Sequence, residues 1–241
     1  MTATERITVR PRTVPAGRAR VEEAARLLAG LAGRLRHGRA LHPRGLVVAA
    51  TLQVRGGSRR PLGLPVLDEP GEHEVIARLS KGGSLPGSLP DVLGLAVRLP
   101  GPVDLLLSTC GPLPWMLLPR TGFTAGPYSS LARYDSGTGS VRLIAWPEGM
   151  RVPADPRLLP QALAREPLLF HLRAAPKGGP VTAVATLRVH TALPDEDVAF
   201  DPVLNSHPAL RQKPWLARLR RGAYLGSRQV RGAKVERGPA S

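Results

Sequence analysis

Hydrophobic residues alternate with polar ones, or run unbroken for a few positions, in six short segments bounded by Gly and Pro, and this pattern predicts β-strands. The predicted strands cover residues 46–54, 74–79, 94–99, 103–107, 140–146 and 180–190. Strands that follow one another without long helices between them favour an antiparallel sheet closed into a barrel.

A helical period appears in three other places. Residues 20–36 carry an apolar stripe at helical spacing, with acidic residues in the first turn and arginines in the last, as the helix dipole favours. A second helix is expected within 155–173 despite Pro160 and Pro167, and a third in 214–231. We therefore predict an α+β fold, an antiparallel β-barrel with helices packed around it.

No repeat and no low-complexity linker divides the chain, so a single domain is expected. Residues 1–18 read as an extended N-terminal arm, 19–234 as the barrel domain and 235–241 as a flexible tail. The 26 Pro and 26 Gly among 241 residues agree with many turns and short elements.

The expected location is the cytoplasm. The single cysteine, Cys110, excludes an internal disulfide and fits a reducing compartment. The first 20 residues lack the apolar core of a secretory signal, and no apolar run approaches the ~18 residues of a membrane span. The oligomeric state is left open.

The chain has 34 basic and 18 acidic residues, a formal net charge of +16, which would ordinarily point to a polyanionic partner. All but four of the basic residues are arginine, a skew that GC-rich codon usage also produces. Basic runs interleaved with aromatic residues are absent, as are zinc knuckles. Nucleic-acid binding is therefore a minor hypothesis.

Three local arrangements suggest chemistry. Tyr224 follows Arg220 by four residues and precedes Arg231 by seven, which on a helix brings all three side chains near one face. His42 precedes a proline, which disfavours helical backbone and presents the imidazole from the start of a strand. Arg78 and Ser80 lie on the same side of a strand. Taken one at a time, these arrangements also fit a basic helix, a loop histidine and a strand edge.

Together, and in this order along the chain, the segments resemble the haem-containing catalases. The matching segments are Arg39-Ala-Leu-His42-Pro-Arg44-Gly45, Arg78-Leu-Ser80-Lys, Asp91-Val-Leu-Gly94-Leu-Ala-Val-Arg98, Asp104-Leu-Leu-Leu-Ser-Thr109, Glu196-Asp-Val-Ala-Phe200-Asp-Pro202, and Arg220 to Arg231 around Tyr224. The resemblance spans roughly residues 36–232 and implies a catalase-like barrel that binds haem b (ferric iron protoporphyrin IX).

On the proximal side of that haem, the resemblance makes Tyr224 the ligand of the iron, as tyrosinate. A phenol of ordinary pKa, near ~10, is neutral at physiological pH, and the Arg220 cation one turn away stabilises the phenolate. Arg39, Arg78 and Arg231 are the implied partners of the two haem propionates.

On the distal side, the resemblance makes His42 the acid–base group, which takes a proton from one peroxide oxygen and returns it to the other. Ser80 is implied to orient the His42 ring. The asparagine with which the family positions peroxide falls near Thr109 or Ser108, where a shorter hydroxyl replaces the amide.

The resemblance implies an enzyme that acts on hydrogen peroxide or organic hydroperoxides with a small-molecule reductant. Because a hydroxyl replaces the asparagine, we expect it to act as a peroxidase more than as an efficient catalase. The family's long arm and C-terminal helical domain are also missing, which implies a more open haem site. Two alternatives stay open. One is haem-dependent rearrangement of hydroperoxides, as in the allene-oxide-forming relatives of catalase, and the other is a non-catalytic module that binds haem, a polyanion or a partner.

Overall fold

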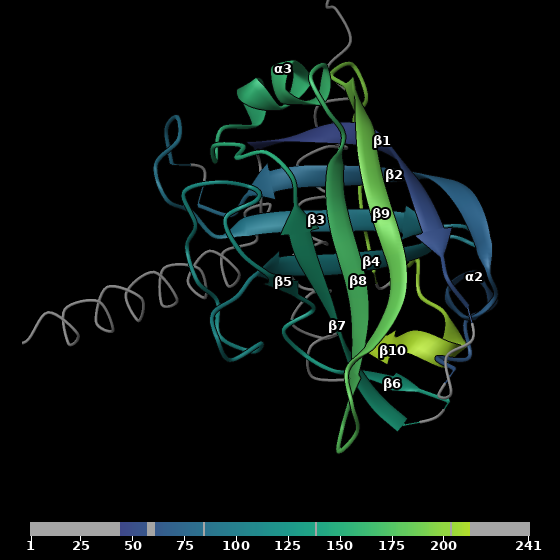
Figure 1. Ribbon diagram of the computed structural model, residues 1–241. Helices are drawn as coiled ribbons and strands as arrows, with labels where there is room; N and C mark the ends of the chain where they lie inside the picture. Colours follow the sequence, from purple (N-terminus) through teal and green to yellow (C-terminus); the bar gives the residue numbers. More distant parts are fainter. Residues whose placement is uncertain (1–43, 57–60, 84, 138, 203, 213–241) are drawn as a thin grey trace, which may run out of the picture.

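The computed structural model describes residues 44–56, 61–83, 85–137, 139–202 and 204–212. In these residues one antiparallel sheet dominates the structure (Figure 1). Its strands are β1 (Arg44–Val54), β2 (Gly71–Lys81), β3 (Leu93–Leu99), β4 (Val103–Thr109), β5 (Tyr128–Ser129), β6 (Tyr134–Ser136), β7 (Gly139–Glu148), β8 (Leu168–Pro176), β9 (Thr182–Leu193) and β10 (Arg211–Gln212).

Eight of these strands close into a barrel. They pair in the order β7-β5-β4-β3-β2-β1-β9-β8, and β8 returns to β7, so the ring has no free end. The short strands β6 and β10 extend the sheet beside the first residues of β7. Closure satisfies backbone donors and acceptors that an open sheet edge would expose. The predicted antiparallel barrel is confirmed.

The helix expected within 155–173 is present but short, and the strand that closes the barrel, β8, occupies the end of that range. Only Leu159–Leu163 (α3), preceded by the 3₁₀ turn Pro156–Leu158, is helical there. From Leu168 the chain is a strand paired with both β7 and β9, and its alternate residues are buried. The helix ends before β8 because the residues between Pro167 and Pro176 follow a period of two rather than the helical period.

Helices are short in the part of the chain that the structure describes. Besides α3 they are α2 (Pro65–Asp68) and the 3₁₀ turn Pro208–Leu210. None of them has the length and apolar character that crossing a membrane requires. The longer helices predicted over 20–36 and 214–231 lie outside the described residues, so the fold seen here is mostly β.

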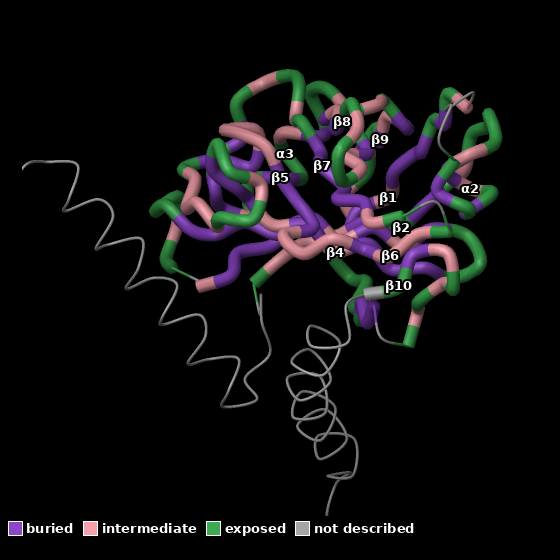
Figure 2. Tube along the Cα trace, turned by 90° about the horizontal axis from the view of Figure 1, so that it is seen from below, coloured by how far each residue is buried: buried purple, intermediate pink, exposed green. Residues whose placement is uncertain are grey.

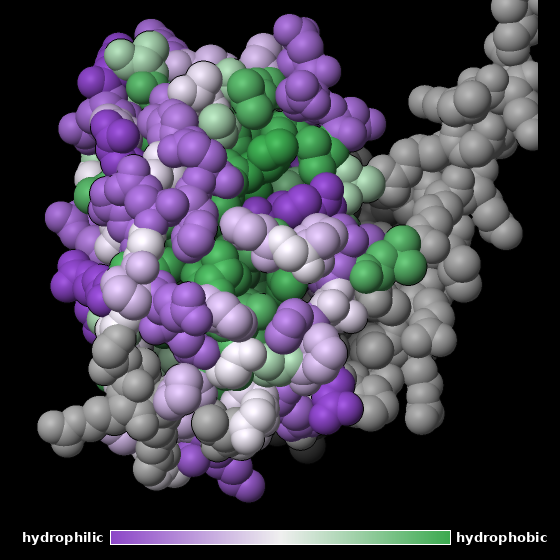
Figure 3. All heavy atoms as spheres, turned by 90° about the vertical axis from the view of Figure 1, so that its right-hand side faces the viewer, coloured by the Kyte–Doolittle hydropathy of each residue, from purple (hydrophilic) through white to green (hydrophobic). Residues whose placement is uncertain are grey.

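The barrel interior is filled by alternate residues of the long strands. Its largest fully buried members include Leu52, Leu79, Leu95, Leu107, Leu143 and Phe170. Tyr128 meets the Phe170 ring edge to face, with centroids 5.7 Å apart. Figure 2 shows the buried residues on the central strands and the exposed ones on the loops around them. Hydrophilic side chains frame a hydrophobic area on the face shown in Figure 3.

A three-residue turn connects β3 and β4. Leu99 and Val103 pair across Pro100-Gly101-Pro102. Gly101 has a φ of 89°, which suits the third position of a type II turn and is costly for other residues. This tight connection fixes the register between β3 and β4, on which the site below depends.

The net charge is unevenly distributed along the chain. The described residues contain 15 basic and 14 acidic side chains and are almost neutral. Nearly all of the +16 therefore belongs to the remaining residues. The barrel itself is not a polycationic surface.

Candidate functional site

A row of small residues crosses four neighbouring strands near one end of the barrel. Gly45 of β1 pairs with Ser80 of β2, Ser80 with Gly94 of β3, and Gly94 with Ser108 of β4. Each alternates with residues of the barrel core, so the row lies on the outer face. We call these four residues the outer row. They leave this face with little side-chain bulk and two hydroxyl groups.

The next position on the same outer face of β2 is Arg78, which pairs with Val47 and Ala96. Its guanidinium lies over Gly45, because a Cβ added at Gly45 would stand 2.9 Å from Arg78 Cζ. The same Cβ would also meet Leu79 O at 2.8 Å and Ser80 Cβ at 2.7 Å. Glycine at position 45 is therefore what allows the Arg78 cation to lie beside the outer row.

Thr109 and Ser108 face opposite sides of the barrel wall. Thr109 is fully buried on the inner side, and its hydroxyl accepts a hydrogen bond from the Leu93 amide at 3.0 Å. Ser108 alternates with it and is half-buried on the outer face, next to Gly94. The sequence analysis left Thr109 and Ser108 as the two hydroxyls near the position of the family's asparagine. Ser108 is the one on the same side as Ser80 and Arg78.

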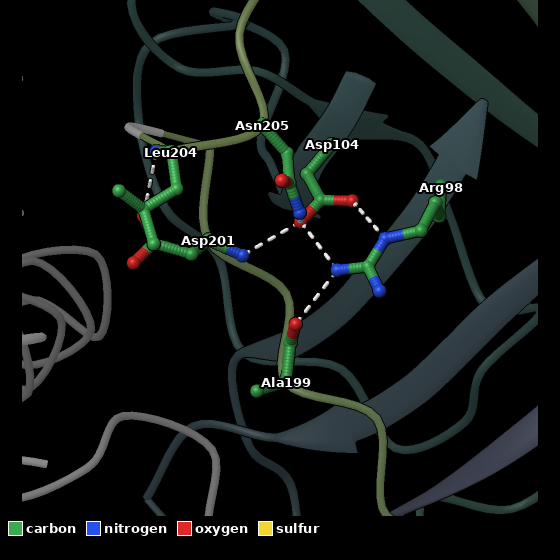
Figure 4. Close-up of polar contacts among 6 residues, drawn as sticks. All are labelled: Arg98, Asp104, Ala199, Asp201, Leu204 and Asn205. Carbon is green, nitrogen blue, oxygen red and sulfur yellow. Dashed lines mark hydrogen bonds and ion pairs between the residues drawn. The ribbon is translucent and has the colours of Figure 1, made fainter. Parts of the chain in front are cut away.

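Asp104, four residues before Ser108 on the same face of β4, ties three of the quoted sequence segments together (Figure 4). Its carboxylate accepts from Arg98 Nε and Nη2, both at 2.8 Å, and from the Asp201 amide and Asn205 Nδ2 at 2.7 and 2.8 Å. The hydrogen bonds that Arg98 donates to Asp104 raise the pKa of Arg98. Arg98 also donates to Ala199 O.

The same guanidinium lies 5.1 Å from the centre of the Phe200 ring, a cation–π contact. The segment around Phe200 is thus held against β3 and β4, although about 100 residues separate it from them. The ordered segments quoted from the sequence are neighbours in space for this reason.

The structure brings together only part of the predicted site. Arg78 and Ser80 share the outer face, and Thr109 does not. The other predicted site residues, Arg39, His42, Arg220, Tyr224 and Arg231, lie outside the described residues. The roles assigned to all eight stay predictions.

The outward direction of Ser108 could have been read from the sequence. Val103, Leu105 and Leu107 are all apolar and mark the inner side of β4, whereas the intervening positions include the polar residues Asp104 and Ser108. The role of Asp104 as an anchor had no comparable signal, because its partners at 201 and 205 are distant in sequence.

No family model matches the sequence, and no curated protein matches it either. Solved structures do. A fungal catalase matches with a TM-score of 0.59 and 12% identity, over 93% of this chain and 64% of that one. Catalase A from Saccharomyces cerevisiae matches with 0.61 and 11%, over 95% and 67%, and a bacterial catalase with 0.60 and 10%, over 94% and 63%.

This chain therefore has a catalase-like fold, as the sequence segments predicted. It spans about two thirds of the length of these catalases. At 10–12% identity the likeness establishes the fold alone.

Proposed function

We propose that this protein is a haem-binding oxidoreductase that acts on hydrogen peroxide or organic hydroperoxides, as a peroxidase more than as a catalase. The observation that supports it most is the outer row, Gly45, Ser80, Gly94 and Ser108, with the Arg78 cation beside it, on a barrel shared with catalases. A fold alone does not define an activity, so the argument depends on these side chains.

The residues fit haem b in two respects. A flat, apolar macrocycle needs a face without bulky side chains, and the outer row leaves such a face on β1 to β4. Its propionates need charge-assisted hydrogen bonds, and the guanidinium of Arg78 lies at the edge of that face. Arg39 and Arg231 are proposed to complete this propionate site.

Tyr224 is proposed as the ligand of the iron. Its phenolate is stabilised in this proposal by the cation of Arg220, because a nearby positive charge lowers the pKa of a phenol. When bound, the haem supplies a redox-active iron whose properties depend on this axial ligand.

On the other side, His42 is proposed to move the proton. His42 precedes Arg44, where β1 begins, by two positions, and Gly45, the first position of the outer row, by three. Its imidazole accepts the proton of one peroxide oxygen and donates it to the other, which makes water or an alcohol the leaving group. Ser80 is proposed to fix the ring orientation of His42.

Ser108 is proposed to donate a hydrogen bond to the peroxide. Its hydroxyl lies on the outer face, whereas the hydroxyl of Thr109 is engaged with Leu93 inside the wall. A serine reaches less far than an asparagine and has one donor instead of two. Weaker positioning of a second peroxide molecule disfavours disproportionation and leaves oxidation of a reductant as the main reaction.

The test is peroxide-dependent oxidation of a small phenolic dye by the full chain loaded with hemin. We expect His42→Ala to keep its haem spectrum and to lose kcat/KM by a factor of about 10² to 10⁴, the usual value of a positioned acid–base group. His190→Ala, on β9, is the matched control.

Equal activity of His42→Ala and the wild type would contradict the proposal and would favour the non-catalytic module. If product analysis shows a fatty-acid hydroperoxide rearranged without any reductant, peroxidase action is contradicted in favour of the rearrangement alternative. Oxygen evolution from hydrogen peroxide measures catalase activity, which we expect to be weak.

A further inference from the structure

Three arginines in the stretch from the end of β4 through β7 have no acidic partner within the described part of the chain. Among the residues that the structure describes, no carboxylate forms a hydrogen bond or ion pair with Arg120, Arg133 or Arg142. Arg133 donates instead to the carbonyls of Ser140 and Ala175, so its guanidinium is used in the backbone framework.

Arg142 is a buried cation held by a neutral group. Only 9% of it is exposed, and its Nε and Nη2 both donate to Leu131 O, at 3.1 and 2.9 Å. Leu131 has a φ of 60°, a left-handed conformation that is rare for leucine. Burial, and next the charge of Arg133, lowers the pKa of Arg142. Burial of a cation without a counter-ion is unfavourable.

Arg120 is the second cation of the cluster. Its Nη2 donates to Cys110 O at 3.0 Å, and its Nε is buried without a hydrogen-bond partner. Gly126 makes room for it, because a Cβ added there would stand 2.6 Å from Arg120 Cζ. A buried donor without an acceptor is uncommon and needs a physical explanation.

The guanidinium groups of Arg120 and Arg142 both lie beside the loop that follows β4. Cys110 lies directly after β4, and burial raises the pKa of its thiol, while the charges of Arg120 and then Arg142 lower it. The geometry agrees, because Arg120 donates to Cys110 O and Arg142 lies beside the Trp115 ring. Both contacts are made to one loop, which a hydrogen bond from Gly111 N to Met116 O closes. Position 110 is two residues after Ser108, so this place adjoins the outer row.

Apolar side chains lie beside the cations. The Trp115 ring lies 5.6 Å from Arg142 Cζ and is 58% exposed. Leu113 and Met116 of the same loop are 46% and 38% exposed. Three large apolar residues exposed within four positions are unusual and commonly mark a binding surface.

We propose that Arg120 and Arg142 bind the carboxylate of an amphipathic organic acid, whose hydrocarbon part lies on Leu113, Trp115 and Met116. Guanidinium groups suit a carboxylate, and the exposed loop suits an alkyl chain. This binding goes beyond the proposed function, because it requires neither haem nor peroxide. It would place the acid next to Ser108.

The experiment is isothermal titration calorimetry of the full chain, without added hemin, with decanoate below its micelle concentration. We expect decanoate to bind, and 1-decanol and inorganic phosphate to bind at least about tenfold more weakly. The alcohol lacks the carboxylate, and phosphate lacks the hydrocarbon chain. Arg120→Gln and Arg142→Gln should each weaken decanoate binding about tenfold or more, since each loses a charge-assisted hydrogen bond.

Trp115→Ala should weaken decanoate binding several-fold. Arg188 is an exposed residue of β9, and Arg188→Gln should leave decanoate binding unchanged. Because Arg142 also supports Leu131, a variant at 142 that fails to fold is set aside, and Arg120→Gln and Trp115→Ala decide. Equal binding of decanoate by Arg120→Gln and the wild type would overturn the proposal, and so would equal binding of decanoate and 1-decanol. If phosphate binds as tightly as decanoate, the hydrocarbon part contributes nothing, and the proposal of an amphipathic ligand is overturned.

Decanoate binding by a protein that fails to bind hemin would contradict the proposed function and leave this inference intact. The two failures are therefore distinguishable.

Discussion

Arg98 and Asp104 face each other across β3 and β4 in a two-point ion pair, with Nε to Oδ1 and Nη2 to Oδ2 both at 2.8 Å. The Asp104 side chain is fully buried and that of Arg98 is 28% exposed. The same carboxylate holds Asp201 and Asn205, so one buried anion joins the barrel wall to the segment that leads into β10. Continuing from β10, the chain reaches the proposed haem ligand Tyr224. Asp104 thus fixes the path of the chain as far as β10.

Asp104→Asn should destabilise the fold. The amide removes the counter-charge of Arg98 and faces other donors with its own NH₂ group, so we expect a loss of about 3 kcal/mol in the free energy of unfolding. Urea denaturation measures it. Glu72→Gln is the control, because the hydrogen bond that the Glu72 carboxylate accepts from Gln53 is exposed, and its change should stay within about 0.5 kcal/mol. Equal midpoints for the two variants would show that the ion pair adds nothing.

Gly45→Ala should disturb the outer row. Its Cβ would stand 2.8 Å from Leu79 O, which is backbone and cannot turn away, and 2.9 Å from Arg78 Cζ. We expect a loss of about 1–3 kcal/mol in unfolding free energy, together with weaker hemin binding as the guanidinium of Arg78 is displaced. Gly137→Ala is the matched control, since a Cβ there meets nothing within 4 Å. An unchanged hemin affinity in Gly45→Ala would remove Arg78 from the propionate site.

Asparagine at 108 and at 109 should have opposite effects. Ser108→Asn places an amide on the outer face, and we expect it to raise the rate of oxygen evolution from hydrogen peroxide severalfold. Thr109→Asn puts a larger polar group inside the barrel wall and breaks the hydrogen bond from the Leu93 amide, so it should cost about 2–3 kcal/mol of stability. An oxygen electrode and thermal unfolding measure the two. Higher oxygen evolution from Thr109→Asn than from Ser108→Asn would contradict the assignment.

Tyr128 should make the barrel sensitive to alkali. Its phenol is buried and donates to Phe123 O at 2.8 Å, and burial raises its pKa far above the ordinary value. A raised pKa in the folded protein means that only the unfolded chain ionises once the pH passes about 10. The stabilising contribution is therefore complete below that pH and falls above it by about 1.4 kcal/mol per pH unit.

Tyr128→Phe lacks this titration. It should be about 1 kcal/mol less stable than the wild type at pH 8, because the Phe123 carbonyl loses its partner. The difference should shrink between pH 10 and 11 in urea denaturation. Since the pKa of Lys81 is lowered by burial, that residue adds stability as the pH rises toward its unfolded value, equally in both proteins. A constant difference across this range would show that the phenol of Tyr128 ionises in the folded state.

The six strands predicted from sequence all exist, because alternation and β-branching report directly on burial of one face. The strands that were missed fall into two kinds. β5, β6 and β10 have two or three residues, too few for any period to appear. β8 was hidden by leucines that suit a helix equally well, so a helix was predicted despite Pro160 and Pro167. Its pairing with β7 and β9 decides its structure, and that pairing is not a local property of the sequence.

The candidate site was predictable where it follows from alternation and not where it depends on distant contacts. The period of two placed Arg78 and Ser80 on one face. The same rule separates Ser108 from Thr109 once the inner face of β4 is known. The unpaired cations at Arg120 and Arg142 gave no signal, because in a chain with so many arginines a missing partner can only be seen in three dimensions.

The central claim is that this barrel binds ferric haem through Tyr224, and titration of the full chain with hemin, followed by visible absorption, tests it most directly. The account predicts one equivalent of hemin bound with the spectrum of a tyrosinate-ligated ferric haem. Tyr224→Phe should lose that spectrum and bind hemin at least about 100-fold more weakly, while Tyr134→Phe on β6 matches the wild type. A protein that stays colourless in excess hemin, or a Tyr224→Phe variant with an unchanged spectrum, would contradict the account.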